Sequence, residues 1–218
     1  MSTLQLRAAD GNVLSAYVVR PEGPPRGAVV VVQEVFGLTS HIRRVTEQYA
    51  AAGYLAIAPA LFDRLQQGVE LPYTSVAEGL ELVARLTDDQ VLADVGAAID
   101  AVAHAGRVGI VGYCWGGRVA WLAACRKNVA AAVSYYGGGI VRLLGETPRC
   151  PIVLHFGERD EHIPLADVER IRQAHPHGIC YLYPAGHGFN CTDRASFEPE
   201  SARLALERSV EFFRKHLG

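Results

Sequence analysis

The residues from 108 to 117, Val-Gly-Ile-Val-Gly-Tyr-Cys-Trp-Gly-Gly, place a cysteine between a β-branched run and a segment that can start a helix. Gly112 and Gly116 stand two residues on either side of Cys114, where a sharp strand-turn-helix bend leaves no room for side chains. A free cysteine is also a common small core residue, but the flanking glycines and the preceding strand favour a nucleophile elbow with cysteine in place of serine. Free N–H groups at a helix N-terminus stabilise negative charge, so this position favours the thiolate.

A thiol nucleophile needs a general base and an acid that orients the base, and both follow later in the chain. Asp160 comes after one predicted strand and His187 after the next, so the order Cys114, Asp160, His187 matches the order of an α/β-hydrolase triad. His187 stands between two glycines, which lets its ring approach a neighbouring loop. Glu158 and Glu161 are alternatives for the acid; Asp160 is favoured because a shorter side chain at a strand end holds the imidazole more rigidly.

Two other kinds of site fit the sequence less well than this arrangement. His155, Glu158 and His162 do not have the spacing of a common zinc site. The glycines around Cys114 follow a strand but fail the G-x-G-x-x-G spacing of a dinucleotide-binding turn. We therefore expect neither a metal nor a cofactor.

The elements that must position these residues alternate between apolar strands and amphipathic helices, which predicts an α/β fold with a mostly parallel, doubly wound sheet. The two N-terminal strands are joined by Asp10-Gly11-Asn12, a sequence typical of a tight turn, and predict an antiparallel edge hairpin. The expected strands are 3–8, 13–19, 28–32, 54–58, 107–111, 131–135, 152–156 and 179–183. The expected helices are 40–52, 88–103, 115–127, 165–174 and 198–217. The least regular part is 62–73, a candidate lid or a plain surface connection, after which a helical pattern resumes.

Length and composition limit the function further. The chain has 218 residues, half of them apolar, and a formal net charge of -2 without blocks of like charge. We expect a single domain over residues 1–218, no nucleic-acid or membrane partner, and a small-molecule substrate. The five cysteines are odd in number and lack C-x-x-C pairs, and no signal peptide is visible, which fits a cytoplasmic protein with reduced thiols.

Four segments together resemble the dienelactone hydrolase family of α/β-hydrolases over nearly the whole chain. They are Gln33-Glu34-Val35-Phe36-Gly37-Leu38, Gly112-Tyr113-Cys114-Trp115-Gly116-Gly117, Tyr135-Tyr136-Gly137 and Gly186-His187-Gly188-Phe189. The resemblance implies hydrolysis of an ester or lactone through an acyl-enzyme, without a cofactor. It implies a catalytic triad of Cys114, Asp160 and His187, a role for Glu34 in activating the thiol, and an oxyanion hole formed by the N–H groups of Val35 and Trp115.

The chain departs from that family at one position. Members that act on dienelactone hold a substrate carboxylate with arginines, one of them two residues after the phenylalanine of the Gly-His-x-Phe segment, where this chain has Cys191. Arg194 and Arg64 are candidate substitutes, and aromatic side chains are candidates to line a more apolar pocket. The expected substrate-binding residues are Phe36, Tyr73, Tyr135, Phe189, Arg64 and Arg194. The substrate itself, and whether the chain is a monomer or a homodimer, stay open.

Two alternative functions remain at this point. One is a general carboxylesterase or thioesterase, which shares the acyl-enzyme chemistry. The other is a non-catalytic α/β domain whose low-pKa thiol senses redox state.

Overall fold

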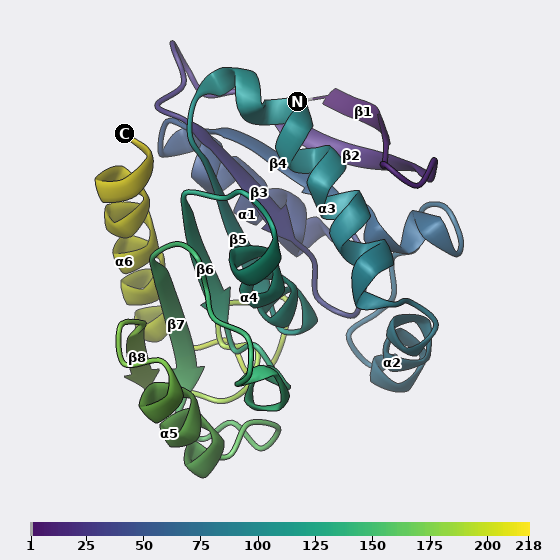
Figure 1. Cartoon of the computed structure of the whole chain (residues 1–218). Coiled ribbons are helices and arrows are strands. Elements are labelled where there is room, and N and C mark those ends of the chain that lie inside the picture. The colour runs from purple at the N-terminus through teal and green to yellow at the C-terminus, as the bar shows by residue number, and fades with distance from the viewer. Residues whose placement is uncertain (1) are drawn as a thin grey trace.

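The computed structural model describes residues 2–218 and contains an eight-stranded sheet (Figure 1). The strands are β1 (Ser2–Arg7), β2 (Val13–Val19), β3 (Ala28–Val32), β4 (Leu55–Pro59), β5 (Val108–Tyr113), β6 (Ala131–Tyr135), β7 (Ile152–Gly157) and β8 (Ile179–Tyr183). Their order in the sheet is β1-β2-β4-β3-β5-β6-β7-β8.

The sheet is antiparallel at one edge and parallel elsewhere. β1 pairs antiparallel with β2 and β2 pairs antiparallel with β4, whereas all the pairs from β4 to β8 are parallel. Gly11 in the hairpin turn has φ 89°, which explains the glycine at that position. The predicted fold class, a mostly parallel α/β sheet with an N-terminal edge hairpin, is confirmed.

Helices cover both faces of the sheet. They are α1 (Ser40–Ala51), α2 (Val76–Ala84), α3 (Asp88–Val102), α4 (Trp115–Arg126), α5 (Leu165–Ala174) and α6 (Pro199–Leu217), with short 3-10 turns at Leu61–Arg64, Ala103–Ala105 and Ile140–Leu143. α1 and α6 share one face, where Tyr49 and Phe213 meet with ring centroids 5.7 Å apart. α3 and α4 pack together on the other face, beside α5 (Figure 1). None of the helices within residues 2–218 has the length and apolarity needed to cross a bilayer.

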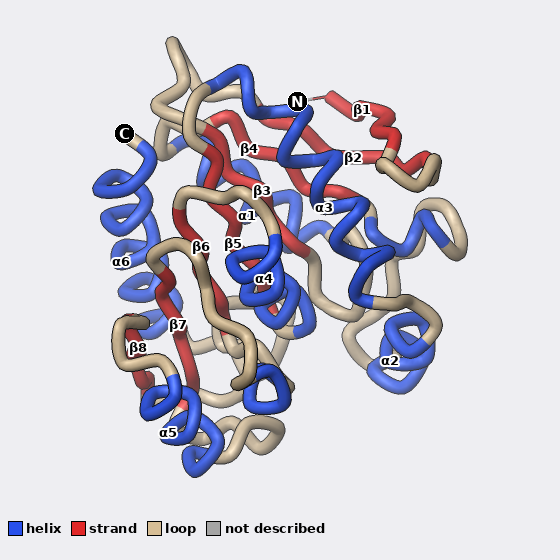
Figure 2. Tube along the Cα trace, in the orientation of Figure 1, coloured by secondary structure: helices blue, strands red, loops and turns tan. Residues whose placement is uncertain are grey.

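The central strands are buried along their whole length because both faces are covered. Every residue of β3, β5, β6 and β7 is buried, which explains their continuous apolar sequences. Parallel strands end at the same edge of a sheet, so the loops that follow β3, β5, β7 and β8 gather at one end (Figure 2). This is the end that carries the residues predicted to do chemistry.

Candidate active site

Cys114 lies at the bend between β5 and α4. Its backbone has φ 55° and ψ -117°, a conformation that L-residues adopt only at a cost of about 1–3 kcal/mol. A Cβ at Gly112 would lie 1.8 Å from the carbonyl oxygen of Gly116, and a Cβ at Gly116 would lie 2.5 Å from the carbonyl oxygen of Gln33. Both glycines are therefore required by close backbone contacts around the bend.

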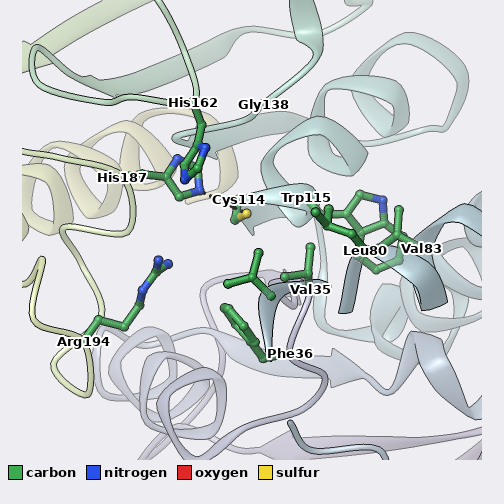
Figure 3. A pocket seen from close by; sticks show the side chains of 11 residues that line it. Val35, Phe36, Leu80, Val83, Cys114, Trp115, Gly138, His162, His187 and Arg194 are labelled. Atoms are coloured by element: carbon green, nitrogen blue, oxygen red, sulfur yellow. Dashed lines mark hydrogen bonds between the residues drawn. The ribbon is translucent and has the colours of Figure 1, made fainter. Parts of the chain in front are cut away.

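The structure brings Cys114, His187 and Asp160 into one hydrogen-bonded chain. His187 Nε2 is 3.1 Å from Cys114 Sγ, and His187 Nδ1 is 2.8 Å from Asp160 Oδ2. The other carboxylate oxygen of Asp160 accepts hydrogen bonds from the backbone N–H groups of His162 (2.8 Å) and Ile163 (3.2 Å). These two bonds fix the carboxylate, the carboxylate fixes the imidazole, and the imidazole faces the sulfur (Figure 3).

The Cys114 sulfur is a thiol at rest, contrary to the expectation from its place at a helix N-terminus. Burial, as the largest cause, and the nearby charge of Glu34 together raise the pKa of Cys114 to about 12, while a hydrogen bond from the Trp115 N–H only partly offsets them. The interpretation as a low-pKa redox sensor loses its physical basis here, because oxidation selects thiols that are already ionised.

Glu34 follows β3 and is fully buried. Neither of its carboxylate oxygens has a hydrogen-bond partner among residues 2–218. The closest opposite charge is Arg194, whose Nη1 lies 3.6 Å from Glu34 Oε1. Burial raises the pKa of Glu34 to about 7, although the charge of Arg194 works against this rise. The carboxyl group therefore changes charge near neutral pH.

Two backbone N–H groups are available near the sulfur. The N–H of Trp115, in the first turn of α4, is directed at Cys114 Sγ, and it has no acceptor within its own helix because it is at the N-terminus. The N–H of Val35 has no backbone acceptor in the part of the chain that the structure describes. Neither N–H group is bound to a backbone acceptor among the described residues, which is the arrangement that an oxyanion hole requires.

Cys114 opens into a mostly apolar cavity of about 270 Å³ (Figure 3). Its lining residues are Val35, Phe36, Val76, Leu80, Val83, Cys114, Trp115, Gly138, His162, His187 and Arg194. In Figure 3 the two histidines and Trp115 lie on opposite sides of Cys114, and Arg194 extends toward the cavity from another loop. Of the expected substrate-binding residues, Phe36 and Arg194 line the cavity.

α2 forms a wall of the cavity that the sequence analysis did not predict. Val76, Leu80 and Val83 line the cavity from this helix, and their spacing of four and three residues is the signal of a helix with one apolar face. Leu80 keeps 54% of its surface exposed. The helix packs closely on the loop after β3, since a Cβ at Gly79 would lie 2.3 Å from the carbonyl oxygen of Val35.

Three expected lining residues belong to the layer behind the cavity. Tyr135 is fully buried, and its hydroxyl is 2.8 Å from Ser209 Oγ on α6. Phe189 is fully buried too. Tyr73 packs edge-on against Phe36, with ring centroids 4.8 Å apart, so it supports a lining residue. These aromatic side chains shape the site from the core.

Arg64 is held away from the cavity by two carboxylates. Its guanidinium forms ion pairs with Asp94 on α3 and Asp10 in the hairpin turn, each at 2.7 Å. The expectation that Arg64 substitutes for a substrate-binding arginine is corrected by these contacts, which fasten the segment 61–64 to the hairpin and α3.

The two histidines of the alternative zinc site, His155 and His162, lie in different surroundings. His155 is buried on β7, with Nδ1 2.8 Å from the Tyr183 hydroxyl and Nε2 3.0 Å from Ser209 Oγ. His162 instead lines the cavity, where its ring lies 5.0 Å from that of His187.

Comparison with known proteins gives matches along most of the chain. The model of the dienelactone hydrolase family matches residues 14–217. A protein of Synechocystis sp. named "Putative carboxymethylenebutenolidase" is 38% identical over 87% of this chain and 86% of its own length. A protein of Escherichia coli (strain K12) with the same name is 35% identical over 96% of this chain and 85% of its own.

Solved structures agree with these sequence matches. The crystal structure of a "Putative Dienelactone Hydrolase" from Klebsiella pneumoniae superposes with a TM-score of 0.87 at 32% identity, covering 99% of this chain and all of that one. The esterase Pf2001 of Pyrococcus furiosus reaches a TM-score of 0.74 at 16% identity, covering 100% of this chain and 93% of the other. At that identity the likeness concerns the fold alone.

Proposed function

Because this chain belongs to the dienelactone hydrolase family and is a carboxylic ester hydrolase, we propose that it cleaves an ester or lactone of a small carboxylic substrate through a cysteinyl acyl-enzyme. Residues 1–218 act as one catalytic domain. The observation that carries the proposal is the unbroken chain from Asp160 through His187 to the sulfur of Cys114, with contacts of 2.8 and 3.1 Å.

Acylation begins from the protonated thiol. His187 Nε2 accepts the proton as Cys114 Sγ attacks the carbonyl carbon, and Asp160 stabilises the imidazolium that forms. The negative charge that develops on the carbonyl oxygen is taken up by the N–H groups of Val35 and Trp115. Loss of one such donor typically costs about 3 kcal/mol of transition-state stabilisation.

The tetrahedral intermediate then collapses as the bond to the leaving oxygen breaks. His187 returns its proton to that oxygen, which leaves as an alcohol, or stays attached as the opened chain when the substrate is a lactone. Water next attacks the thioester on Cys114 with His187 as general base, which releases the carboxylic acid and restores the thiol.

The family resemblance implies that Glu34 activates the thiol, whereas its charge favours a different role in the resting protein, as a restraint on the ionisation of Cys114. Its charge opposes ionisation of Cys114, so the sulfur transfers its proton only when an electrophilic carbon is in place to receive the electron pair. Full burial of Glu34 strengthens this effect because a low local dielectric screens charges weakly.

The cavity favours a small acyl group with at most one negative charge. Its walls are mostly apolar, and its single cationic lining residue is Arg194, whose only carboxylate contact within 4.0 Å among residues 2–218 is the 3.6 Å approach to Glu34. A substrate carboxylate placed there gains a charge-assisted hydrogen bond. A general carboxylesterase with neutral substrates is the alternative that the apolar walls support.

The experiment compares cis-dienelactone with p-nitrophenyl acetate and p-nitrophenyl butyrate, using Cys114→Ala as the blank. We expect turnover of at least one ester by the unmodified protein and none by the variant. Intact-mass measurement of the unmodified protein, quenched with acid during turnover, should show one acyl group, located on Cys114 after digestion. If all three esters are inert, or if Cys114→Ala retains the activity, the proposal is wrong.

A further inference from the structure

Three buried side chains of different chemistry meet beside the candidate active site. Glu34 follows β3, His41 is in the first turn of α1, and Cys191 comes from the loop between β8 and α6. One carboxylate oxygen, one ring nitrogen and the sulfur all lie within 4.8 Å of one another. Within residues 2–218, this is the one trio of histidine, cysteine and acidic side chains that comes so close together.

Polar atoms of two of these residues are buried without a partner. Both oxygens of Glu34 and Nε2 of His41 lack a hydrogen bond among the described residues, and Glu34 and His41 are 0% and 3% exposed. Buried polar groups in native proteins are nearly always satisfied, because each unsatisfied one has lost its hydration without compensation. Since one oxygen of Glu34, one ring nitrogen of His41 and the sulfur of Cys191 lie within 4.8 Å of one another, a ligand that accepts an electron pair from each would satisfy these buried groups.

The donor set fits a divalent ion of borderline softness. Burial lowers the pKa of His41 to about 4, so its imidazole is neutral and keeps a lone pair for coordination. Nitrogen, sulfur and carboxylate oxygen together are typical zinc ligands, whereas Mg²⁺ and Ca²⁺ prefer oxygen alone. A thiolate and a carboxylate also balance the charge of a doubly positive ion.

The geometry leaves room for coordination with a small adjustment. Tetrahedral zinc holds neighbouring ligand atoms about 3.3 to 3.6 Å apart, from bond lengths of about 2.0 to 2.3 Å, so the three atoms must approach one another by up to about 1.5 Å. Three protein ligands leave a fourth position for water. One member of the trio, His41, also lines a second cavity of about 360 Å³, together with Arg44 and Asn190.

We propose that Glu34, His41 and Cys191 form a binding site for a divalent metal ion of the zinc type. Binding forms a metal–sulfur bond and releases the Cys191 thiol proton to solvent; when Glu34 is protonated, its proton is released too. The site does not use Cys114, and the proposal does not depend on the hydrolytic reaction.

The test uses the full chain with its thiols reduced. Bound metal is removed with EDTA, the EDTA is removed in turn, and the protein is titrated with Co²⁺ and then with Zn²⁺ as competitor. We expect one Co²⁺ per chain, with a thiolate-to-cobalt charge-transfer band that Zn²⁺ abolishes. The band should persist in Cys114→Ala, which removes the neighbouring thiol, and in Cys180→Ser, a matched control on β8. It should be absent in Cys191→Ser, and affinity should fall by about tenfold or more in His41→Gln.

Two results of this titration would overturn the proposal. Absence of a charge-transfer band in the unmodified protein overturns the proposal and leaves the trio as a hydrated cluster. A band that survives Cys191→Ser but disappears in Cys114→Ala also overturns it, because the ion then binds at the elbow. Far-UV circular dichroism of each variant shows whether it is folded, and Cys191→Ala provides a second sulfur-free variant if the serine is poorly accommodated.

Discussion

Replacing Glu34 with glutamine tests whether a buried carboxylate keeps the Cys114 sulfur protonated. The substitution keeps the shape of the side chain and removes its charge, while His187, Asp160 and Arg194 continue to face the sulfur and the new amide. Since the charge of Glu34 is one of the two main causes that raise the pKa of Cys114, the variant should have a more acidic thiol and should be alkylated faster.

The size of the effect follows from the pKa values, and its sign depends on pH. A thiol with a pKa of about 12 is ionised at about one part in 10,000 at pH 8, and each unit by which the pKa falls raises that fraction about tenfold. Glu34 has a pKa of about 7, so it is neutral below that pH and charged above it. The variant and the unmodified protein should therefore react alike near pH 6 and differ by roughly 10-fold to 100-fold near pH 9.

The assay measures alkylation of Cys114 by iodoacetamide, an uncharged reagent, from about pH 6 to about pH 9 with EDTA present. Peptide mass spectrometry separates Cys114 from the other four cysteines. Glu158→Gln, which removes an exposed carboxylate from the loop after β7, serves as the matched control. A rate ratio for Glu34→Gln that stays near one across the whole range would refute the reasoning.

Three other perturbations test separate parts of the structure. Arg194→Ala should raise KM about tenfold or more for an ester that carries a free carboxylate. The KM for neutral esters, measured in parallel steady-state assays, should stay unchanged. Gly79→Ala should lower kcat about tenfold, because its Cβ would lie 2.3 Å from the carbonyl oxygen of Val35 and displace a proposed oxyanion donor. Burial lowers the pKa of His155 in the folded protein to about 3, whereas the unfolded chain has the ordinary value of about 6.5. Between these two pH values only the unfolded chain binds a proton at His155. The free energy of unfolding should thus fall with falling pH in that window, by up to about 1.4 kcal/mol per pH unit, and His155→Gln should flatten the fall in urea titrations.

Two of these changes have matched controls in the chain. Arg20→Ala removes the same charge from an exposed position at the end of β2 and should leave both kinds of ester unaffected. Gly96→Ala makes the same change on α3, where a new Cβ meets only the flexible end of Lys127, at 3.3 Å. An equal loss of kcat in both glycine variants would contradict a specific effect on the loop after β3.

The order of the strands and helices could be predicted from the sequence because it depends on local patterns. Continuous apolar runs marked the buried parallel strands, and the strand at 28–32 was predicted with the bounds that the structure has. The strand ending in the elbow extends two residues beyond its prediction, to Tyr113, since Gly112 and Tyr113 still pair with β6. The bounds of α2 were not predicted, although Val76, Leu80 and Val83 have helical spacing; that this apolar face lines a cavity depends on packing that the sequence does not show.

Part of the candidate site could also be predicted from local sequence patterns, and part depends on contacts between residues far apart in the sequence. The flanking glycines and the chain order of Cys114, Asp160 and His187 are local signals, and the structure places these three side chains in contact. The ion pairing of Arg64 could not be predicted from the sequence, because its partner Asp10 comes from a distant turn. The approach of His41 to Cys191 was equally hidden, since these residues are far apart in sequence and meet only through the packing of separate elements.

The protonation state of Cys114 shows why a motif alone does not determine reactivity. A helix N-terminus stabilises a nearby negative charge by about 0.3 to 1 kcal/mol, whereas a rise in pKa from 9.0 to about 12 corresponds to roughly 4 kcal/mol against the thiolate. Burial and the charge of Glu34 therefore outweigh the helix. Because His187 Nε2 is only 3.1 Å from the sulfur, the proton can transfer during attack on a carbonyl, when bonding to carbon disperses the charge that the site otherwise disfavours. Under the proposed mechanism, the nucleophile in this elbow is therefore the thiol–imidazole pair, and its reactivity depends on the substrate being present.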